Sequence, residues 1–255
     1  MIEEEIHGIH LPSLLQSWAD RCEHKQKRVR TRRRLLAASA AVMEQAGYEG
    51  LTVDAIVRHA RVARGTFYLY FSDRSIAAIE VMRAFAAMMR KHRPRGGARL
   101  SAVQSIYRIN LFYSLSYSRN SRLLAGRESL MRDCPELVVR RDAINTYWAR
   151  LVLKDLHRRC DVSMERLRLP QAELAIRAVL SMADEFLREI YVYQSPNLVQ
   201  LAQNPHEVAL VLTQVWHRAV FGQDPDGWDP VQGLPMTGDV CMGSVNSILL
   251  AGADG

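Results

Sequence analysis

Apolar residues recur at three- and four-residue steps along most of the chain, and glycine, proline and capping residues separate these runs. Such spacing places the apolar side chains on one face of a helix, so each run predicts an amphipathic helix. In the first third of the chain, Gly47 follows one run where a helix ends, and Thr52 precedes another as an N-cap. The helices expected here span 32–46, a segment opening at 53–57, 64–71, and a segment that begins after Ser72 or Asp73 and ends at Pro94.

The same periodicity continues beyond Pro94, Gly96 and Gly97, which interrupt the pattern and mark a candidate domain boundary. The helices expected in this part span 100–117, 122–131, 135–160, 171–193 and 208–221. No run shows the two-residue alternation of a convincing strand, and no internal repeat is present. The pattern therefore predicts an all-α chain of about nine or ten helices.

The two ends of the chain carry weaker patterns. Residues 1–24 alternate short apolar clusters with polar residues. They could form an amphipathic helix or an ordered tail, but a loosely held extension is the interpretation we favour. Residues 223–255 are rich in Gly, Asp and Pro and lack a helical period, which predicts a mostly disordered tail.

Charge adds a feature that the apolar pattern does not reveal. Residues 21–34 hold eight Lys and Arg residues and one Glu, whereas residues 35–74 balance four cations against four acids. The net charge of residues 21–34 is thus +7, equal to the formal net charge of the whole chain. A solvated surface run would explain it, but its place before three short helices favours a basic arm, 25–34, that contacts DNA phosphates. The arm residues expected to do so are Lys27, Arg28, Arg30 and Arg32.

A tight corner at 61–63 separates the helix that opens at 53 from the helix at 64–71, as in a helix-turn-helix pair. The second helix of such a pair exposes short or planar hydrogen-bonding side chains to the major groove. Arg64 is suited to guanine O6 and N7, and Thr66 to a thymine methyl or a phosphate. The candidates for sequence choice are Arg64, Thr66 and Tyr68.

The aromatic residues of this second helix divide between two roles. Phe67 and Phe71, one turn apart, are expected to face inward. Their expected neighbours are Leu36, Ile56 and Ala60. An aromatic core stripe alone would not explain why Tyr68 and Tyr70 accompany them. The residues placed to contact phosphates at the groove edges are Thr52, Tyr70 and Arg74.

This segment resembles the N-terminal domain of the tetracycline-repressor-like (TetR) family of transcriptional regulators. The residues that carry the resemblance are Ala46-Gly47-Tyr48, Leu51-Thr52-Val53-Asp54-Ala55-Ile56 and Arg64-Gly65-Thr66-Phe67-Tyr68-Leu69-Tyr70-Phe71. The helices that follow agree with the family in layout only. The resemblance implies a homodimer that binds a palindromic operator in double-stranded DNA, as a repressor that a small-molecule effector releases. The DNA contacts it implies are Thr52, Thr66, Tyr68, Tyr70 and Arg74, with Arg64 and Gly65 near the bases.

Two positions depart from the usual pattern of this family. Arg61 stands in the turn where Gly is usual, and Ala63 stands where Ser or Thr often caps the next helix. A left-handed Arg and a missing cap each cost about 1 kcal/mol. Either the recognition helix is looser than usual or Arg61 offsets its strain by binding a phosphate, and we slightly favour the phosphate contact.

The remaining helices point to a dimer contact and a ligand pocket. Segments 171–193 and 205–221 look like the pair that forms the dimer interface in this family, although the second could be an ordinary core helix. The residues expected at that interface are Val211, Val215, Trp216 and Ala219. An apolar pocket with a few polar groups is expected along one face of 100–117, although such stripes are more often core. Its expected residues are Tyr107, Asn110, Leu111, Ser114, Tyr117, Tyr147, Trp148, Met182 and Phe186.

These features divide the chain into four parts. They are an N-terminal extension (1–24), a helix-turn-helix domain with its basic arm (25–74), a helical ligand-binding and dimerisation domain (75–222) and a tail (223–255). The cysteines, Cys22, Cys134, Cys160 and Cys241, lack the spacing of a zinc site or a disulfide framework. No secretory signal is present, and no apolar run reaches the roughly 18 residues of a membrane span. We therefore expect a cytoplasmic protein without a cofactor, a metal or a membrane partner.

Two other functions are compatible with parts of the sequence. An enzyme would need a catalytic motif, and the chain contains no HExxH, GxSxG or Gly-rich phosphate loop. Its acids Asp184, Glu185 and Glu189 fall on different sides of a helix, which fits a solvated face better than a metal site. A DNA-binding scaffold that senses no ligand and docks partners through its long ends is the other alternative.

Overall fold

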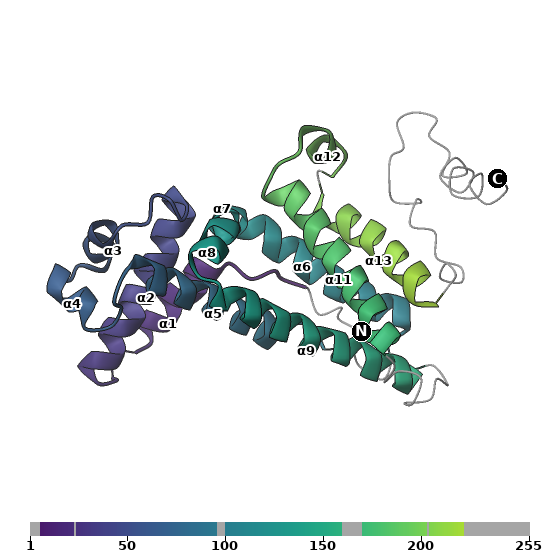
Figure 1. The fold of residues 1–255 in the computed structure, drawn as a ribbon, viewed down its shortest axis with the longest axis horizontal. Helices are drawn as coiled ribbons and strands as arrows, with labels where there is room; N and C mark the ends of the chain where they lie inside the picture. The colour runs from purple at the N-terminus through teal and green to yellow at the C-terminus, as the bar shows by residue number, and fades with distance from the viewer. Residues whose placement is uncertain (1–5, 23, 96–99, 160–169, 203, 222–255) are drawn as a thin grey trace.

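The computed structural model describes residues 6–22, 24–95, 100–159, 170–202 and 204–221 (Figure 1). Within these ranges every regular element is a helix, so the prediction of an all-α fold is confirmed. The helices are α1 (Leu11–Asp20), α2 (Lys27–Ala46), α3 (Val53–Ala60), α4 (Arg64–Tyr68), α5 (Arg74–His92), α6 (Ala102–Arg119), α7 (Ser121–Ala125), α8 (Arg127–Asp133), α9 (Glu136–Arg159), α11 (Pro170–Tyr191), α12 (Pro196–Leu201) and α13 (Pro205–Phe221). The tail predicted at 223–255 lies outside the described residues.

Local side-chain caps fix several helix starts. The Thr52 hydroxyl accepts a hydrogen bond from the Ala55 amide at 3.1 Å and begins α3. The Asp73 carboxylate accepts one from the Ile76 amide at 3.0 Å and begins α5. Ser101 forms a reciprocal capping box at the start of α6. These caps satisfy backbone donors that the first turn of a helix leaves unpaired, so the boundaries follow from short sequence signals.

The N-terminal extension is more ordered than the sequence indicated. Leu11, Leu15 and Ala19 of α1 are buried in the main hydrophobic cluster, and α1 packs along α2. Before α1, Asn120 at the end of α6 accepts a hydrogen bond from the Leu11 amide at 2.8 Å and donates one to the Ile9 carbonyl at 2.7 Å. The expectation of a loosely held extension is therefore wrong, because its apolar face and its backbone both find partners far away in the sequence.

Three other elements differ from the expected ones. Helix α2 begins at Lys27 rather than at residue 32, so most of the basic arm is helical. The expected helix at 122–131 is divided at Gly126 into α7 and α8. A Cβ added to Gly126 would lie 2.4 Å from the Cβ of Tyr48, so the absence of a side chain permits this close contact. The short α12 was not expected from the sequence.

Figure 1 shows the helices in two groups. Helices α1 to α4 form one end of the molecule, which we call the head, and α6, α9, α11 and α13 form a bundle at the other end. Helix α5 reaches from the head along the bundle and contacts both α2 and α8. One hydrophobic cluster runs through both groups, from Leu11 and Phe67 in the head to Phe112 and Leu212 in the bundle. The two parts are therefore packed against each other rather than joined by a loose linker.

Candidate DNA interface and ligand cavity

Helices α3 and α4 form a compact helix-turn-helix unit on α2. Phe67 and Phe71 are 0% and 2% exposed, and their ring centroids lie 5.6 Å apart. Leu36, Ile56 and Ala60 belong to the same buried cluster, so the predicted inward orientation of the two rings is confirmed. Because these rings fix its inner face in a close-packed core, α4 presents its outer face as a rigid surface.

The turn between α3 and α4 has the backbone conformation that the sequence indicated. Arg61 has φ 53° and ψ 51°, in the left-handed region that favours glycine. Ala63 precedes α4 without a side-chain cap, and α4 ends at Tyr68 rather than at residue 71. The Arg61 side chain is exposed and makes no hydrogen bond or ion pair to the rest of the described chain. Its charge is therefore available to an external anion.

The outer face of α4 joins one cation to an exposed aromatic ring. Arg64 forms an ion pair with Asp54 of α3. The hydrogen bond to Asp54 raises the pKa of the Arg64 guanidinium, and the hydrogen bond to Tyr68 raises it further by a smaller amount. Tyr68 is 48% exposed, and Thr66 on the same short helix is partly exposed. The three side chains predicted to read bases thus lie at the surface of one helix.

Gly65 lies on this face with open space around it. A Cβ built at Gly65 would meet no atom of the protein within 4 Å. Its backbone is not left-handed, unlike that of Gly47 with φ 69°. Neither packing nor conformation within the chain therefore requires glycine at position 65. The missing side chain instead leaves room for a partner to approach the backbone of α4.

The cations of the basic arm differ in what they contact. Lys27, Arg28 and Arg30 are exposed on the first turns of α2. Arg32 instead donates a hydrogen bond to Glu80 of α5 at 2.8 Å. The structure thus uses Arg32 to join α2 to α5, and a DNA contact by this residue would require the ion pair to open.

The next two arginines are also held within the protein. The Arg33 guanidinium stacks on Trp18 of α1, 3.8 Å from the ring centroid. Arg34 donates to the Ala60 carbonyl, at the end of α3, at 2.6 Å. These contacts fasten α1 and α3 to α2. The charge that can face DNA is therefore concentrated nearer the start of the helix.

The residues predicted to contact phosphates at the groove edges also differ in exposure and in contacts. Thr52 is exposed, and its hydroxyl oxygen already caps α3. Tyr70 is partly buried and packs against the main cluster. Arg74 donates to the carbonyls of Tyr48, Glu49 and Leu51 at 3.0 to 3.3 Å. The structure thus gives Arg74 a bracing role in the loop between α2 and α3 instead of leaving it extended toward a phosphate.

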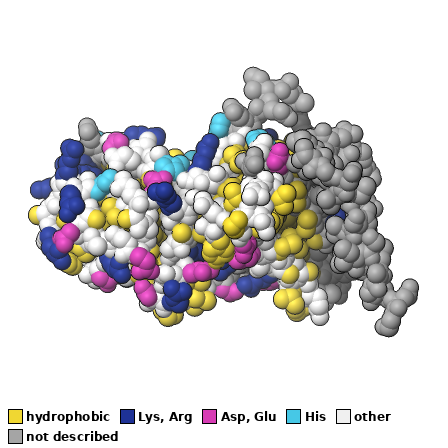
Figure 2. All heavy atoms as spheres, turned by 90° about the horizontal axis from the view of Figure 1, so that it is seen from above, with side chains coloured by type: hydrophobic (Ala, Val, Ile, Leu, Met, Phe, Trp, Pro, Cys, Tyr) yellow, Lys and Arg dark blue, Asp and Glu magenta, His cyan; other side chains and the backbone are white. Residues whose placement is uncertain are grey.

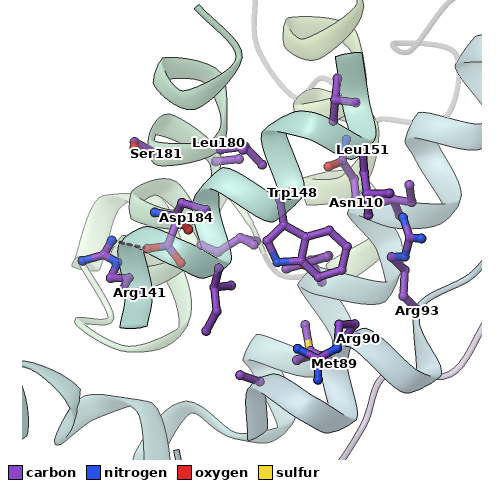
Figure 3. Close-up of a pocket in the computed structure, with 18 of the residues that line it drawn as sticks. Met89, Arg90, Arg93, Asn110, Arg141, Trp148, Leu151, Leu180, Ser181 and Asp184 are labelled. Atoms are coloured by element: carbon purple, nitrogen blue, oxygen red, sulfur yellow. Dashed lines mark hydrogen bonds and ion pairs between the residues drawn. The ribbon is translucent and has the colours of Figure 1, made fainter. Parts of the chain in front are cut away.

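The bundle encloses a cavity of about 1170 Å³ between α5, α6, α9 and α11. Trp148 lies in its middle (Figure 3), and the Tyr113 ring packs edge-on against Trp148 with centroids 6.3 Å apart. The Tyr113 hydroxyl makes no hydrogen bond to another described residue, and burial raises its pKa, so the group is a neutral donor at the cavity wall. A space of this size exceeds the usual range for small-ligand pockets, about 300–1,000 Å³.

The expected pocket residues are only partly brought together. Asn110, Tyr117 and Trp148 line the cavity. The expected residues that do not line it are Tyr107, Leu111, Ser114, Tyr147, Met182 and Phe186. The residues of α6 that do are Ser105, Ile106, Ile109, Asn110, Tyr113 and Tyr117. The cavity thus faces a side of α6 about one residue away from the predicted one.

Specific contacts explain why two of the expected residues do not line the cavity. Tyr107 hydrogen-bonds His206 of α13 at 3.0 Å, and Ser114 hydrogen-bonds the Tyr191 hydroxyl of α11 at 2.7 Å. Both side chains therefore join helices of the bundle. Met182 is instead exposed, and Phe186 packs against the main cluster.

A partly buried ionic cluster forms the cavity wall nearest α8. Asp184 of α11 accepts hydrogen bonds from Arg127 at 3.0 Å, from Arg141 at 2.9 Å and from the Tyr117 hydroxyl. Burial alone would raise the pKa of Asp184, but Arg127 and the other donors outweigh burial and lower it. Asp184 is thus held by partners within the protein, so the expectation that it lies on a solvated face is wrong.

Helix α8 connects this wall to the head. Arg127 and Met131 of α8 line the cavity. At the end of the same helix, Asp133 accepts a hydrogen bond from the Tyr48 hydroxyl at 2.8 Å. Tyr48 belongs to the loop between α2 and α3 and is buried against Gly126. A displacement of α8 by a ligand would therefore reach the helix-turn-helix unit through one side chain.

The outer faces of α11 and α13 carry apolar side chains in contact with solvent. On α11, Leu174, Ala178 and Met182 are exposed at four-residue spacing, as are Val211 and Val215 on α13. Ala219 continues the second stripe. Figure 2, which views the molecule from above, shows hydrophobic side chains gathered over the described part of the bundle. Two adjacent exposed apolar stripes indicate an interaction surface.

Trp216 does not belong to that surface. It is 8% exposed, and it lines the cavity with an indole N–H that has no hydrogen-bond partner in the described structure. The expectation of a dimer contact by Trp216 is therefore not supported by its position. Val211 and Val215 are four residues apart and share one face of α13, whereas Trp216 is turned about 100° from Val215 and lies on another face.

Several other classes of site find no support in the described residues. No group of His, Cys, Asp and Glu among them could hold a metal ion. Cys22 and Cys134 are unpaired thiols, and Cys160 and Cys241 lie outside the described residues. No described helix is long and apolar enough to cross a membrane.

The comparison with known proteins agrees with the geometry of the head. Residues 35–75 match the family model described as bacterial regulatory proteins, tetR family. This stretch begins within α2 and ends at the start of α5, so it contains α3, the turn and α4. No curated protein matches the chain significantly.

Proposed function

We propose that this chain, which belongs to the tetR family of bacterial DNA-binding transcriptional regulators, is a dimeric repressor that a small ligand releases from a palindromic operator. The observation that supports operator binding most directly is the open space around Gly65 on the outer face of α4. A major-groove reader needs close approach of its recognition helix to the bases. In this proposal Arg64, Thr66 and Tyr68 contact base edges, and Lys27, Arg28, Arg30 and Arg61 contact phosphates.

The variant Gly65→Ala tests this role of α4. Since the added methyl group meets nothing within the protein, we expect an unfolding temperature equal to or above that of the wild type. Alanine is favoured over glycine in a helix by up to about 1 kcal/mol. We expect affinity for a duplex from the promoter region of its own gene to fall about tenfold, or about 1.4 kcal/mol, in fluorescence anisotropy.

Ser118→Ala is the matched control, because Ser118 is exposed at the end of α6, outside the head. It should leave both readings unchanged. A Gly65→Ala variant that binds the duplex as tightly as the wild type would contradict the proposed approach of α4 to DNA.

The dimer proposal rests on the exposed stripes of α11 and α13. Leu174 is 70% exposed, and Val211 and Val215 are 38% and 37% exposed, which is unfavourable for a monomer in water. Pairing these stripes across a two-fold axis would bury them and place two heads on successive half-sites of a palindrome.

A Val211→Glu/Val215→Glu variant should therefore sediment as a monomer and lose most of its operator affinity. Val139→Glu is the matched control, since Val139 is 72% exposed on α9. It should sediment as the wild type does. If both variants and the wild type sediment alike, these stripes are not the dimer contact.

Ligand-dependent release is supported by the cavity and by the path from its wall to the head. Arg127 and Met131 contact the cavity, while Asp133 of the same short helix holds Tyr48 in the head. A ligand that fills the cavity and shifts α8 would thus move the loop that positions α3. Such a shift favours release only if the ligand binds the shifted arrangement more tightly.

A further inference from the structure

The charged residues that line the cavity are strongly unequal in sign. Two carboxylates, those of Asp155 and Asp184, belong to its wall. The cations of the wall are Arg83, Arg90, Arg93, Arg95, Arg127, Arg140, Arg141, Lys154, Arg158 and Arg159. A cavity for a neutral apolar ligand has no need of such an excess, since each uncompensated cation repels the others.

These cations are not evenly distributed along the cavity. Near α8, Arg127 and Arg141 are both bound to Asp184, so these two cations share a carboxylate partner. In Figure 3 the Asp184–Arg141 pair lies on one side of Trp148, and Arg90 and Arg93 lie on another side. The two ends of the cavity therefore differ in character.

The far end gathers cations from the last turns of two helices. Three come from the end of α5 and the residues after it, and three from the end of α9. They are Arg90, Arg93, Arg95, Lys154, Arg158 and Arg159, which we call the cationic end; of these, Arg93 reaches back to Trp148, with its guanidinium carbon 5.1 Å from the ring centroid. Its carboxylate in the described wall is Asp155, and both Arg158 and Arg159 bind it. Arg90, Arg95 and Lys154 make no ion pair to another described residue.

Between the two ends the wall is mainly apolar. It is formed by Ile106 and Ile109 of α6, Trp148 and Leu151 of α9, and Leu180 of α11. Asn110 is the buried polar side chain of this stretch, and it donates to Thr213 at 3.1 Å. The cavity thus offers an apolar middle and one end at which six cations face the single described carboxylate of Asp155.

We infer that the ligand of this cavity is an amphipathic anion, whose apolar body lies along Trp148 and whose phosphate, sulfonate or carboxylate group lies at the cationic end. This inference deepens the proposed ligand response and rests on it. An anionic group there would relieve the mutual repulsion of the cations and accept charge-assisted hydrogen bonds from several of them. The apolar body would be removed from water by the middle of the cavity.

Two fluorescent probes that share one apolar body test the inference. 1-Anilinonaphthalene-8-sulfonate carries a sulfonate, and N-phenyl-1-naphthylamine lacks it. The test variant is Arg90→Gln/Lys154→Gln, which removes two cations from the cationic end. The matched control is Arg150→Gln, because Arg150 is exposed on α9 outside the cavity wall.

For the sulfonate we expect the dissociation constant of the double variant to rise about five- to ten-fold, since two partly screened charge interactions are lost. The neutral probe should bind wild type and double variant within twofold. Arg150→Gln should bind both probes as the wild type does. An unchanged sulfonate affinity in the double variant, or an equal loss for both probes, overturns the anionic class.

A second measurement separates this inference from the proposed repressor function. Dodecyl phosphate should displace the bound sulfonate probe at lower concentration than dodecanol, and it should release the promoter duplex. Displacement without release leaves the ligand class standing and contradicts ligand-controlled release. Better displacement by dodecanol overturns the ligand class. If neither probe binds the wild type, both the ligand class and the ligand response are overturned.

Discussion

The head and the bundle fill their interiors in different ways. The interior of the head consists of closely packed apolar side chains such as Met43, Leu51, Phe67 and Phe71. The bundle surrounds a large cavity and holds partly buried charged groups in its walls, as the Asp184 cluster shows. A dense apolar core holds one arrangement, whereas a hollow polar one can be completed by a ligand. The head is therefore packed as a rigid unit, whereas the bundle contains space that a ligand could fill.

Buried charge in the bundle is not confined to the cavity. Arg188 of α11 is 6% exposed and pairs with Glu128 of α8 and Glu185 of α11. Its Nη1 to Glu185 Oε2 distance is 3.0 Å. In the head, the ion pair of Arg64 and Asp54 is on the surface. The Arg188–Glu128 pair thus joins α8 to α11 with a buried guanidinium, whereas the Arg64–Asp54 pair of the head faces solvent.

The largest contrast should appear when the two interiors lose an apolar side chain. Phe67→Ala removes a fully buried ring, so the free energy of unfolding should fall by about 3–5 kcal/mol. Ile109→Ala removes a side chain that already borders the cavity, and it should cost about 1 kcal/mol. Urea unfolding followed by circular dichroism measures both. Equal losses would mean that the cavity wall is packed as tightly as the head.

The next contrast concerns ion pairs. Asp184→Asn removes the charge that Arg127 and Arg141 surround, so the free energy of unfolding should fall by about 2–3 kcal/mol. Asp54→Asn removes an exposed carboxylate and should change it by less than about 0.5 kcal/mol. Chemical denaturation at pH 7 measures the free energy of unfolding of both variants. A loss in Asp54→Asn as large as that in Asp184→Asn would contradict the contrast.

Acid should reduce the difference in free energy of unfolding between the wild type and Asp184→Asn. The folded-state pKa of Asp184 is lowered from an ordinary value of 3.8, so its stabilising contribution is present above that value. The contribution is lost as the pH falls through the lowered folded-state pKa. The difference in unfolding free energy between wild type and variant should therefore be constant from pH 7 to about 5 and shrink below about pH 4. If the difference in unfolding free energy instead grows on acidification, folding raises the pKa of Asp184 rather than lowering it.

A smaller effect is expected where the two regions meet. Tyr48→Phe removes hydrogen bonds to Asp133 at 2.8 Å and Ser75 at 3.0 Å and should lower the free energy of unfolding by about 1 kcal/mol. In the proposed function, the variant should bind dodecyl phosphate normally but release the promoter duplex less completely. Probe displacement and anisotropy, measured on the same sample, separate the two effects. Unaltered release would exclude the Tyr48 hydroxyl from the coupling path.

The smallest effect on stability is expected at the start of α2. Lys27→Gln/Arg28→Gln should change the free energy of unfolding by less than about 0.5 kcal/mol, because both side chains are exposed. In the proposed function each lost phosphate contact reduces the slope of log affinity against log salt concentration by about 1. Duplex binding at several salt concentrations measures the slope. If the variant shows the same slope of log affinity against log salt concentration as the wild type, Lys27 and Arg28 do not contact DNA phosphates.

The head could be read from the sequence because its signals are local. Thr52 and Asp73 cap helices within a few residues, and Phe67 and Phe71 are one turn apart on one face. The left-handed turn at Arg61 also occurs where the resemblance to the TetR family implied it. Such features depend on neighbours in the chain, so one segment suffices to predict them.

The cavity wall could not be read in the same way. Helix α6 is apolar on several faces, and the sequence does not say which face meets α13. Tyr107 joins α13 and Ser114 joins α11, which leaves Ile106, Ile109 and Tyr113 to line the cavity. A shift of one position turns a helix by about 100°. The choice of face thus depends on where the neighbouring helices lie.

The all-helical fold, the helix-turn-helix segment and the positive charge before it could be predicted from the amino-acid sequence, since each follows from spacing along the chain. Which of the charges are exposed depends on how the helices pack. It ties Arg32 to Glu80 and Arg74 to the loop after α2, and it collects cations from α5 and α9 at one end of the cavity. Burial and ion pairing are properties of helices brought together from distant parts of the chain, and no local pattern specifies them.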